Sequence, residues 1–171
     1  MKINGIISDS IVDGPGLRTT IFFQGCLRHC PGCHNPQTWE CDTGIDVTPK
    51  ELLDAIVEKG GQNITLSGGE PLLQAKEIVE FVRLYKAKYP LNNIWLWTGA
   101  KIEDVWAHKD YAGCNSNMAL RLIYSVDYIV DGAFMLDKRD ITLKFRGSSN
   151  QRIWHHGLQG FEDVTQEMDP R

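Results

Sequence analysis

Four apolar stretches, each ending in glycine or a small polar residue, constrain the fold of this chain more than any other feature. They end at Gly25, Ser67, Thr98 and Asp131, and helical patterns separate each from the next. Strands that alternate with helices form parallel, right-handed βαβ units, so their carboxyl ends gather at one edge of a sheet. We therefore expect an α/β fold in which the loops after these strands form a common site.

Two segments between these stretches carry strong helix signals. Segment 46–61 has Thr48 as a start signal, Pro49 at the first helical position and apolar residues at helical spacing. Segment 74–90 is amphipathic and ends before its proline. Both are predicted helices on the surface of the sheet.

The second half of the chain repeats the alternation less clearly. Helical patterns occupy 101–110 and 115–125, and 140–154 is predicted as two strands around a polar turn at 147–150. On the stretch before Thr98, Trp95 and Trp97 alternate and should share a face, which suggests packing.

Chain length limits how far the sheet can close. The chain has 171 residues, 42% of them apolar, which suits a single domain over residues 1–171. A complete eight-fold barrel needs about 250 residues. We therefore expect an open, partial (β/α) barrel of about four to six mostly parallel strands.

Charge and hydropathy bear on partners and location. The net charge of -4 and pI near 5.7 argue against nucleic acid or an anionic membrane as a partner. No apolar run is long enough to cross a bilayer, and the first ten residues lack the apolar stretch of a secretory signal. These features predict a cytoplasmic protein.

Three of the five cysteines, Cys26, Cys30 and Cys33, lie within eight residues in the loop after the first strand. Such density indicates a metal or redox site in a reducing compartment. Structural zinc or a four-cysteine cluster needs a fourth ligand, which Cys41 could supply, whereas His34 would have to turn back sharply. The position at the ligand end of a parallel sheet disfavours zinc.

The spacing Cys-x-x-x-Cys-x-x-Cys, with Ser-Gly-Gly-Glu-Pro at 67–71 after the next strand, resembles the radical S-adenosylmethionine enzymes. The resemblance implies a radical SAM core in which the three cysteines hold a 4Fe-4S cluster and S-adenosylmethionine completes the coordination of the fourth iron. It also implies an oxidoreductase that needs no catalytic side chain beyond the cluster and S-adenosylmethionine. Reductive cleavage of the sulfonium would release a 5'-deoxyadenosyl radical.

The same resemblance implies which residues contact S-adenosylmethionine. One departure is visible, because many members carry an aromatic residue where this chain has Gly32. For Asp131, capping of a helix is an equal alternative to a ligand contact. The implied cofactor-binding residues are Gly32, Cys33, His34, Ser67, Gly68, Gly69, Glu70, Thr98, Gly99 and Asp131.

The segment from Asp13 to Asn35, including the lead-in Asp13-Gly-Pro-Gly-x-Arg18, resembles the glycyl-radical-enzyme activases. The short chain and the tail 145–154 are most similar to activases of an anaerobic ribonucleoside-triphosphate reductase, which is the implied partner. The deoxyadenosyl radical would abstract hydrogen from a glycine of that reductase, and flavodoxin is the electron donor that the family suggests.

Several alternatives stay open at this point. The partner could be another glycyl-radical enzyme such as pyruvate formate-lyase, or the substrate a small molecule as in deazapurine-forming relatives. The chain could also be a non-catalytic four-cysteine metal protein. The segment from Arg146 to Arg152 is either a polar hairpin turn or a surface that docks a partner.

Overall fold

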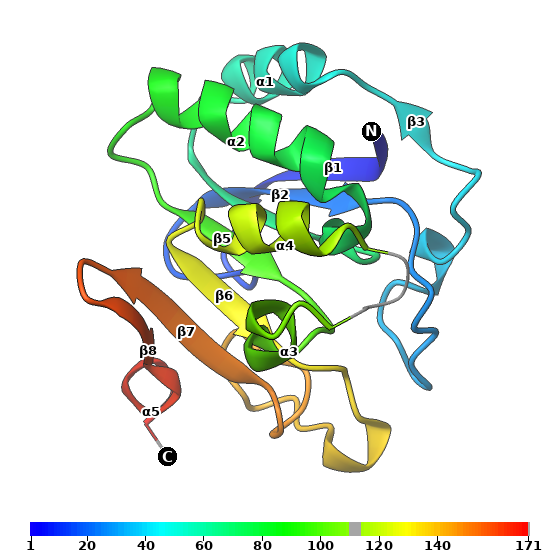
Figure 1. Ribbon diagram of the computed structural model, residues 1–171, viewed down its shortest axis with the longest axis vertical. Coiled ribbons are helices and arrows are strands. Elements are labelled where there is room, and N and C mark those ends of the chain that lie inside the picture. The colour runs from blue at the N-terminus through cyan, green and yellow to red at the C-terminus, as the bar shows by residue number, and fades with distance from the viewer. Residues whose placement is uncertain (110–113, 171) are drawn as a thin grey trace.

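The computed structural model describes residues 1–109 and 114–170, and its centre is one mixed sheet of eight strands (Figure 1). The order across the sheet is β3-β1-β2-β4-β5-β6-β7-β8. The strands are β1 (Lys2–Ser10), β2 (Arg18–Phe23), β3 (Ile45–Asp46), β4 (Asn63–Gly68), β5 (Ile94–Trp97), β6 (Tyr128–Asp131), β7 (Arg152–Gly157) and β8 (Gly160–Asp163).

The four strands expected from the sequence form the parallel centre of this sheet. Strand β2 pairs with β4, β4 with β5, and β5 with β6, all in parallel. The strand count and the predominance of parallel pairs were predicted wrongly. Strands β3 and β1 on one side, and β7 and β8 on the other, add antiparallel pairings. Asparagine, glycine, serine and aspartate interrupt β1, so its pairing with β2 is not evident from its own pattern.

The strand expected at the start of segment 140–154 does not form. The carboxylate of Asp140 accepts hydrogen bonds from the Thr142 backbone nitrogen at 2.8 Å and its hydroxyl at 2.6 Å. This local turn competes with an extended conformation, and Phe145 takes a left-handed φ of +56°. Only the second expected strand, β7, is present.

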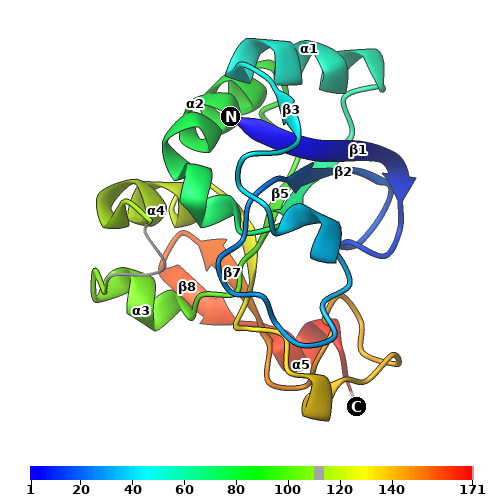
Figure 2. The same ribbon diagram turned by 90° about the vertical axis from the view of Figure 1, so that its right-hand side faces the viewer.

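The helices that connect β3 to β4, β4 to β5 and β5 to β6 cover one face of the sheet (Figures 1 and 2). Within the described residues, no helix combines the length and apolarity needed to cross a membrane. The expected helix 101–110 is shorter than predicted, and Asp110 lies outside the described residues. The helices are α1 (Pro49–Glu58), α2 (Ala75–Lys88), α3 (Ile102–Trp106), α4 (Ser116–Ile123) and α5 (Thr165–Met168), with 3-10 turns η1 (Pro36–Thr38), η2 (Pro71–Gln74) and η3 (Leu136–Lys138).

Helix α1 begins where its sequence signals place it. Thr48 accepts a hydrogen bond from the Glu51 backbone nitrogen, and the Glu51 side chain accepts one from the Thr48 backbone nitrogen at 2.7 Å. This reciprocal capping satisfies donors that a helix leaves free at its start. Leu52 and Ile56 on the opposite side are buried against α2 and the sheet.

The two faces of the sheet pack differently. Alternate residues of β5, Ile94 and Leu96, belong to the large core under the helices. Trp95 and Trp97 both point to the opposite face, as predicted, into a smaller cluster with Val130. Trp95 is fully buried, whereas Trp97 reaches the site at the end of the strand.

The Asp13–Arg18 lead-in lies at the amino ends of the parallel strands, opposite the cysteine loop. Arg18 is fully buried, donates to Asn93 Oδ1 at 2.6 Å, and lies 5.4 Å over the ring of Trp95. A Cβ on Gly14, whose φ is +136°, would stand 2.1 Å from the Arg18 guanidinium. Burial lowers the pKa of Arg18 to about 10. This motif braces the fold and does not reach the cysteines.

Candidate active site

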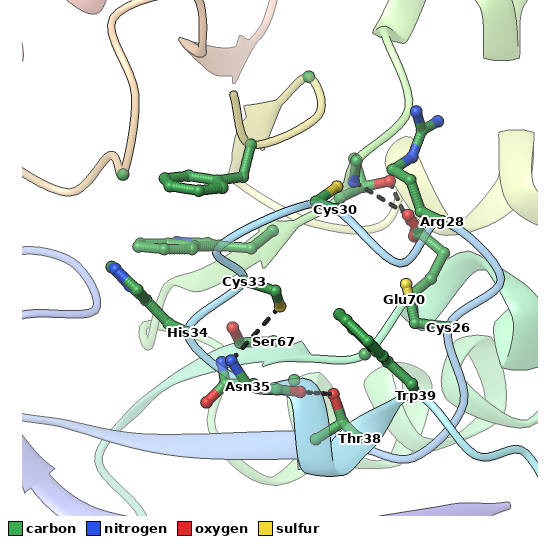
Figure 3. A pocket seen from close by; sticks show the side chains of 18 of the residues that line it. Cys26, Arg28, Cys30, Cys33, His34, Asn35, Thr38, Trp39, Ser67 and Glu70 are labelled. Carbon is green, nitrogen blue, oxygen red and sulfur yellow. Dashed lines mark hydrogen bonds between the residues drawn. The ribbon is translucent and has the colours of Figure 1, made fainter. Parts of the chain in front are cut away.

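A pocket of about 140 Å³ opens at the carboxyl ends of β2, β4, β5 and β6 (Figure 3). Four segments form its walls: the cysteine loop with η1, the Ser-Gly-Gly-Glu turn, the end of β5, and the connection from β6 to β7. Its lining residues are Cys26, Arg28, Cys30, Cys33, His34, Asn35, Thr38, Trp39, Ser67, Gly68, Gly69, Glu70, Trp97, Thr98, Gly99, Gly132, Phe134, Gly147 and Gln151.

Backbone hydrogen bonds hold the cysteine loop against the segment that follows it. Gly25 donates to the Thr38 carbonyl at 2.8 Å, and Cys26 donates to the Trp39 carbonyl at 3.0 Å. His29 takes a left-handed φ of +45°, and its ring stacks on Trp39 with centroids 4.7 Å apart. Trp39 therefore supports the loop from outside while it lines the pocket.

Cys26, Cys30 and Cys33 are free thiols, partly buried, that all line this pocket (Figure 3). Burial raises the pKa of the Cys26 and Cys30 thiols. In residues 1–109 and 114–170, no three histidine, cysteine or acidic side chains converge closely enough for a single metal ion. A four-iron cluster binds each thiolate to a different iron, so three separated thiols around one cavity fit a cluster better than a lone ion.

Neither remaining cysteine contributes to the pocket. Cys41 is exposed and packs beside Gly25, where an added Cβ would stand 3.2 Å from the Cys41 sulfur. Cys114 is buried in the core under the helices. The pocket therefore has three thiols from the described chain, and a four-thiolate site completed by Cys41 is not formed.

The Ser-Gly-Gly-Glu turn packs directly on the start of the cysteine loop. A Cβ on Gly69 would lie 2.3 Å from the Gly25 carbonyl oxygen, and one on Gly68, whose φ is +100°, would lie 2.4 Å from the Phe23 nitrogen. Glu70 donates its backbone N–H to the same Gly25 carbonyl at 2.8 Å. Both glycines are thus required for contact between two protein segments.

The side chain of Glu70 joins the end of β4 to the end of β5. It is 2% exposed, and its carboxylate accepts from the Thr98 hydroxyl at 2.8 Å and from the Gly99 nitrogen at 2.9 Å. The same carboxylate caps η2 by accepting from the Leu72 nitrogen at 3.1 Å. Three of the residues singled out in the sequence, Glu70, Thr98 and Gly99, are therefore fixed together by hydrogen bonds in the pocket wall.

Asp131, although at the end of β6, does not line the pocket. It is fully buried, and it accepts hydrogen bonds from the Ile102 nitrogen at 2.9 Å and from Arg152 at 2.5 and 3.0 Å. The Arg152 guanidinium also forms an ion pair with the Glu103 carboxylate, with 2.6 Å between nitrogen and oxygen. The Asp131 carboxylate therefore binds the first backbone nitrogen of α3, a helix that precedes β6 in the chain, and does not cap a helix after its own strand.

Gly32 and His34 flank the third cysteine in different ways. His34 lines the pocket, and its ring lies 5.6 Å from the ring of Phe134. Gly32 does not line it, and a Cβ there would stand 2.8 Å from Leu136. An aromatic side chain next to Cys33 would thus displace the side chain of Leu136.

Sequence reasoning missed much of the far wall of the pocket. From its alternation with Trp95, Trp97 was predicted only to pack against the sheet, yet it also lines the pocket. Its position as the last residue of β5 could have indicated this second role. Phe134 and Gln151 had no such signal. Gln151 accepts from the Gly147 and Ser148 nitrogens at 2.9 and 3.1 Å and donates to the Gly132 carbonyl, so it shapes the polar turn that lines this side.

Three free thiols around a cavity at the carboxyl ends of parallel strands define an iron–sulfur protein built on an α/β sheet. In agreement, residues 12–154 match the family model described as 4Fe-4S single cluster domain. The chain belongs to the family of anaerobic ribonucleoside-triphosphate reductase-activating proteins, as its similarity to curated relatives shows.

Three relatives with that name illustrate the extent of the match. The protein from Escherichia coli K12 is 36% identical over 153 residues, covering 85% of this chain and 92% of its own. The protein from phage T4 is 38% identical over 160 residues, covering 90% and 94%. The protein from Haemophilus influenzae is 32% identical over 150 residues, covering 84% and 90%. Among solved structures, QueE from Escherichia coli aligns with a TM-score of 0.48 at 20% identity, over 58% of this chain and 52% of that one.

Proposed function

We propose that this protein is a radical S-adenosylmethionine oxidoreductase that activates an anaerobic ribonucleoside-triphosphate reductase by generating a glycyl radical on it. The observation that carries the proposal is a pocket with three cysteine thiols, and no fourth from the described residues, in a chain of this family. A cluster with three protein ligands leaves one iron for a small-molecule ligand. Such an iron is what S-adenosylmethionine requires.

In this proposal Cys26, Cys30 and Cys33 hold the 4Fe-4S cluster. When bound, the cluster and S-adenosylmethionine supply a one-electron cleavage of a carbon–sulfur bond and, through it, abstraction of a hydrogen atom from a reductase glycine. The protein surrounds the reacting groups with a partly enclosed cavity, and its walls carry indole and phenyl rings from Trp39, Trp97 and Phe134 that exclude water.

The Ser67–Glu70 turn, Thr98 and Gly99 would bind S-adenosylmethionine beside Cys33 and His34. Glu70 acts here as a positioning residue, because its carboxylate is already committed to Thr98, Gly99 and Leu72. The turn carbonyls remain candidates to accept hydrogen bonds from the methionyl ammonium. Gly32 and Asp131 have supporting roles, since neither lines the pocket.

The proposal includes finer points that follow from the family. The sheet would correspond to the open partial barrel of a radical SAM core, with residues 1–171 as one domain. Flavodoxin would be the electron donor, and the protein would act in the cytoplasm. The alternative partner, pyruvate formate-lyase, is less favoured because the relatives that match over most of this chain act, by name, on the ribonucleotide reductase.

Anaerobic reconstitution tests the proposal. We expect about four irons and four sulfides per chain for the wild type and for Cys41→Ala, and loss of the cluster for Cys33→Ala. Reduced wild-type protein with S-adenosylmethionine should release deoxyadenosine, and electron paramagnetic resonance should detect a glycyl radical only when the reductase is present. A cluster that depends on Cys41, or one that leaves S-adenosylmethionine intact, would contradict the proposal.

A further inference from the structure

A second, shallower hollow adjoins the pocket. It is lined by Pro31 of the cysteine loop and by residues 134–137, which we call the lip. Phe134 lines both this hollow and the pocket, so the two lie on either side of this residue. Met135 and Leu136 on the lip are 37% and 52% exposed. These two apolar side chains therefore lie exposed beside the opening of the pocket.

The lip is exposed although its backbone is firmly held. Met135 donates to the Ser148 hydroxyl at 3.2 Å, and Ser149 donates to the Lys138 carbonyl at 2.9 Å. Lys138 in turn donates to the Met135 carbonyl at 3.0 Å within η3. Since the supporting Ser148 is fully buried, the apolar side chains are presented on a fixed frame, which lowers the entropy cost of binding a partner.

The lip also contacts the cysteine loop. Leu136 lies over Gly32, where a Cβ would approach its Cδ1 to 2.8 Å, and both ribbon views place η3 next to that loop (Figures 1 and 2). The absence of a side chain at Gly32, which departs from many relatives in the wider superfamily, therefore makes room for the lip. The cysteine loop, through Pro31, and the lip together line the hollow.

The polar tail supports this surface from behind and does not itself present free cations. Arg146 pairs with Asp169 at 2.6 Å, with both side chains buried, and Arg152 pairs with Glu103 and Asp131. The turn between the two arginines bonds to the lip through Ser148 and to the adjoining Lys138 through Ser149. A partner that docks here thus meets apolar side chains more than basic ones.

We infer that the hollow between Pro31 and the lip receives an apolar side chain that neighbours the substrate glycine in an extended segment of the reductase. This inference rests on the proposed function. Glycine offers no side chain to recognise, so the segment must be selected through its neighbours. In an extended chain, side chains two residues apart project to the same side. A residue two positions from the glycine, anchored in the hollow, would therefore leave the glycine directed past Phe134 into the pocket.

Single aspartate substitutions on the lip test the inference in the reconstituted holoprotein under anaerobic conditions. Met135→Asp should raise the Kd for the intact reductase by about tenfold or more, as expected when one apolar side chain that the complex would bury is lost. Deoxyadenosine release without reductase should stay within about twofold of wild type. The matched control is Leu158→Asp, since Leu158 is fully exposed on the β7–β8 turn and outside both hollows.

Leu136→Asp provides a second, independent variant. It should weaken reductase binding similarly, and radical yield should recover when the reductase concentration is raised. If Leu136→Asp loses iron through its contact with Gly32, binding by Met135→Asp decides the question. Wild-type affinity in Met135→Asp, or an equal loss in Leu158→Asp, would overturn the inference. Failure of the wild type to cleave S-adenosylmethionine would instead refute the proposed function.

Discussion

Gly69→Ala should damage the site by pushing apart two segments that the fold holds in contact. The added methyl group would stand 2.3 Å from the Gly25 carbonyl oxygen and 3.0 Å from the Thr38 carbonyl oxygen. Ordinary contact begins near 3.4 Å, so the turn and the cysteine loop must separate by roughly 1 Å. Overpacking of this kind costs about 1–3 kcal/mol. Loss of the hydrogen bond from Glu70 to Gly25 adds about 1 kcal/mol.

Urea denaturation of the anaerobic protein measures this effect. With a slope of about 1–3 kcal/mol per molar urea, a loss of about 2–4 kcal/mol should lower the midpoint by roughly 1 M or more. Rates of deoxyadenosine release should fall about a hundredfold, because a 1 Å displacement near reacting groups has that effect. Gly5→Ala is the matched control, since a Cβ at Gly5 meets no atom within 4 Å. Equal midpoints for the two variants would refute the reasoning.

Two further predictions concern the ionic network around β6. Arg152→Met should destabilise the protein by about 3–5 kcal/mol, because it leaves the fully buried Asp131 carboxylate without its cation. Chemical denaturation would show this, whereas a loss below about 1 kcal/mol would contradict it. The hydrogen bond from Arg152 lowers the pKa of Glu103 to about 2. The Glu103–Arg152 pair therefore stabilises the folded protein fully above about pH 4.5, and this contribution is lost as the pH falls toward 2. The contribution is less than about 1 kcal/mol, because Glu103 is partly exposed. Melting temperatures of wild type and Glu103→Gln should differ at pH 6, differ less at pH 3 and converge near pH 2, and a constant difference would exclude this pair as the cause.

The central fold was predictable because its signals are local. Thr48 and Glu51 cap α1 through residues three apart, and apolar runs define the parallel strands. The outer strands were not predictable from local signals. Strand β1, for example, has a sequence that is poor for a strand and is stabilised by its pairing with β2. Asp140 had the opposite effect, since its own side chain stabilises a turn where β-branched residues suggested a strand.

Some residues of the site were likewise predictable from local sequence, and others were not. The three cysteines and the Ser-Gly-Gly-Glu turn are recognisable from spacing, and the structure brings them to one cavity. Trp39 is held at that cavity by the hydrogen bond that its carbonyl accepts from Cys26 and by stacking with His29. Gln151 reaches it through a turn more than a hundred residues away from the cysteines. Such contacts depend on tertiary arrangement, which no short motif encodes.

The position of Arg18 bears on how such sequences should be altered or searched. The lead-in from Asp13 to Arg18 helps to identify the family, yet Arg18 is buried against Trp95 and Asn93 at the edge remote from the thiols. Libraries randomised over this hexapeptide would therefore be filtered first by yield of soluble protein, and survivors should retain their turnover. Conspicuous sequence signatures can thus mark architecture, so proximity to a motif alone is a poor guide when choosing targets for enzyme engineering.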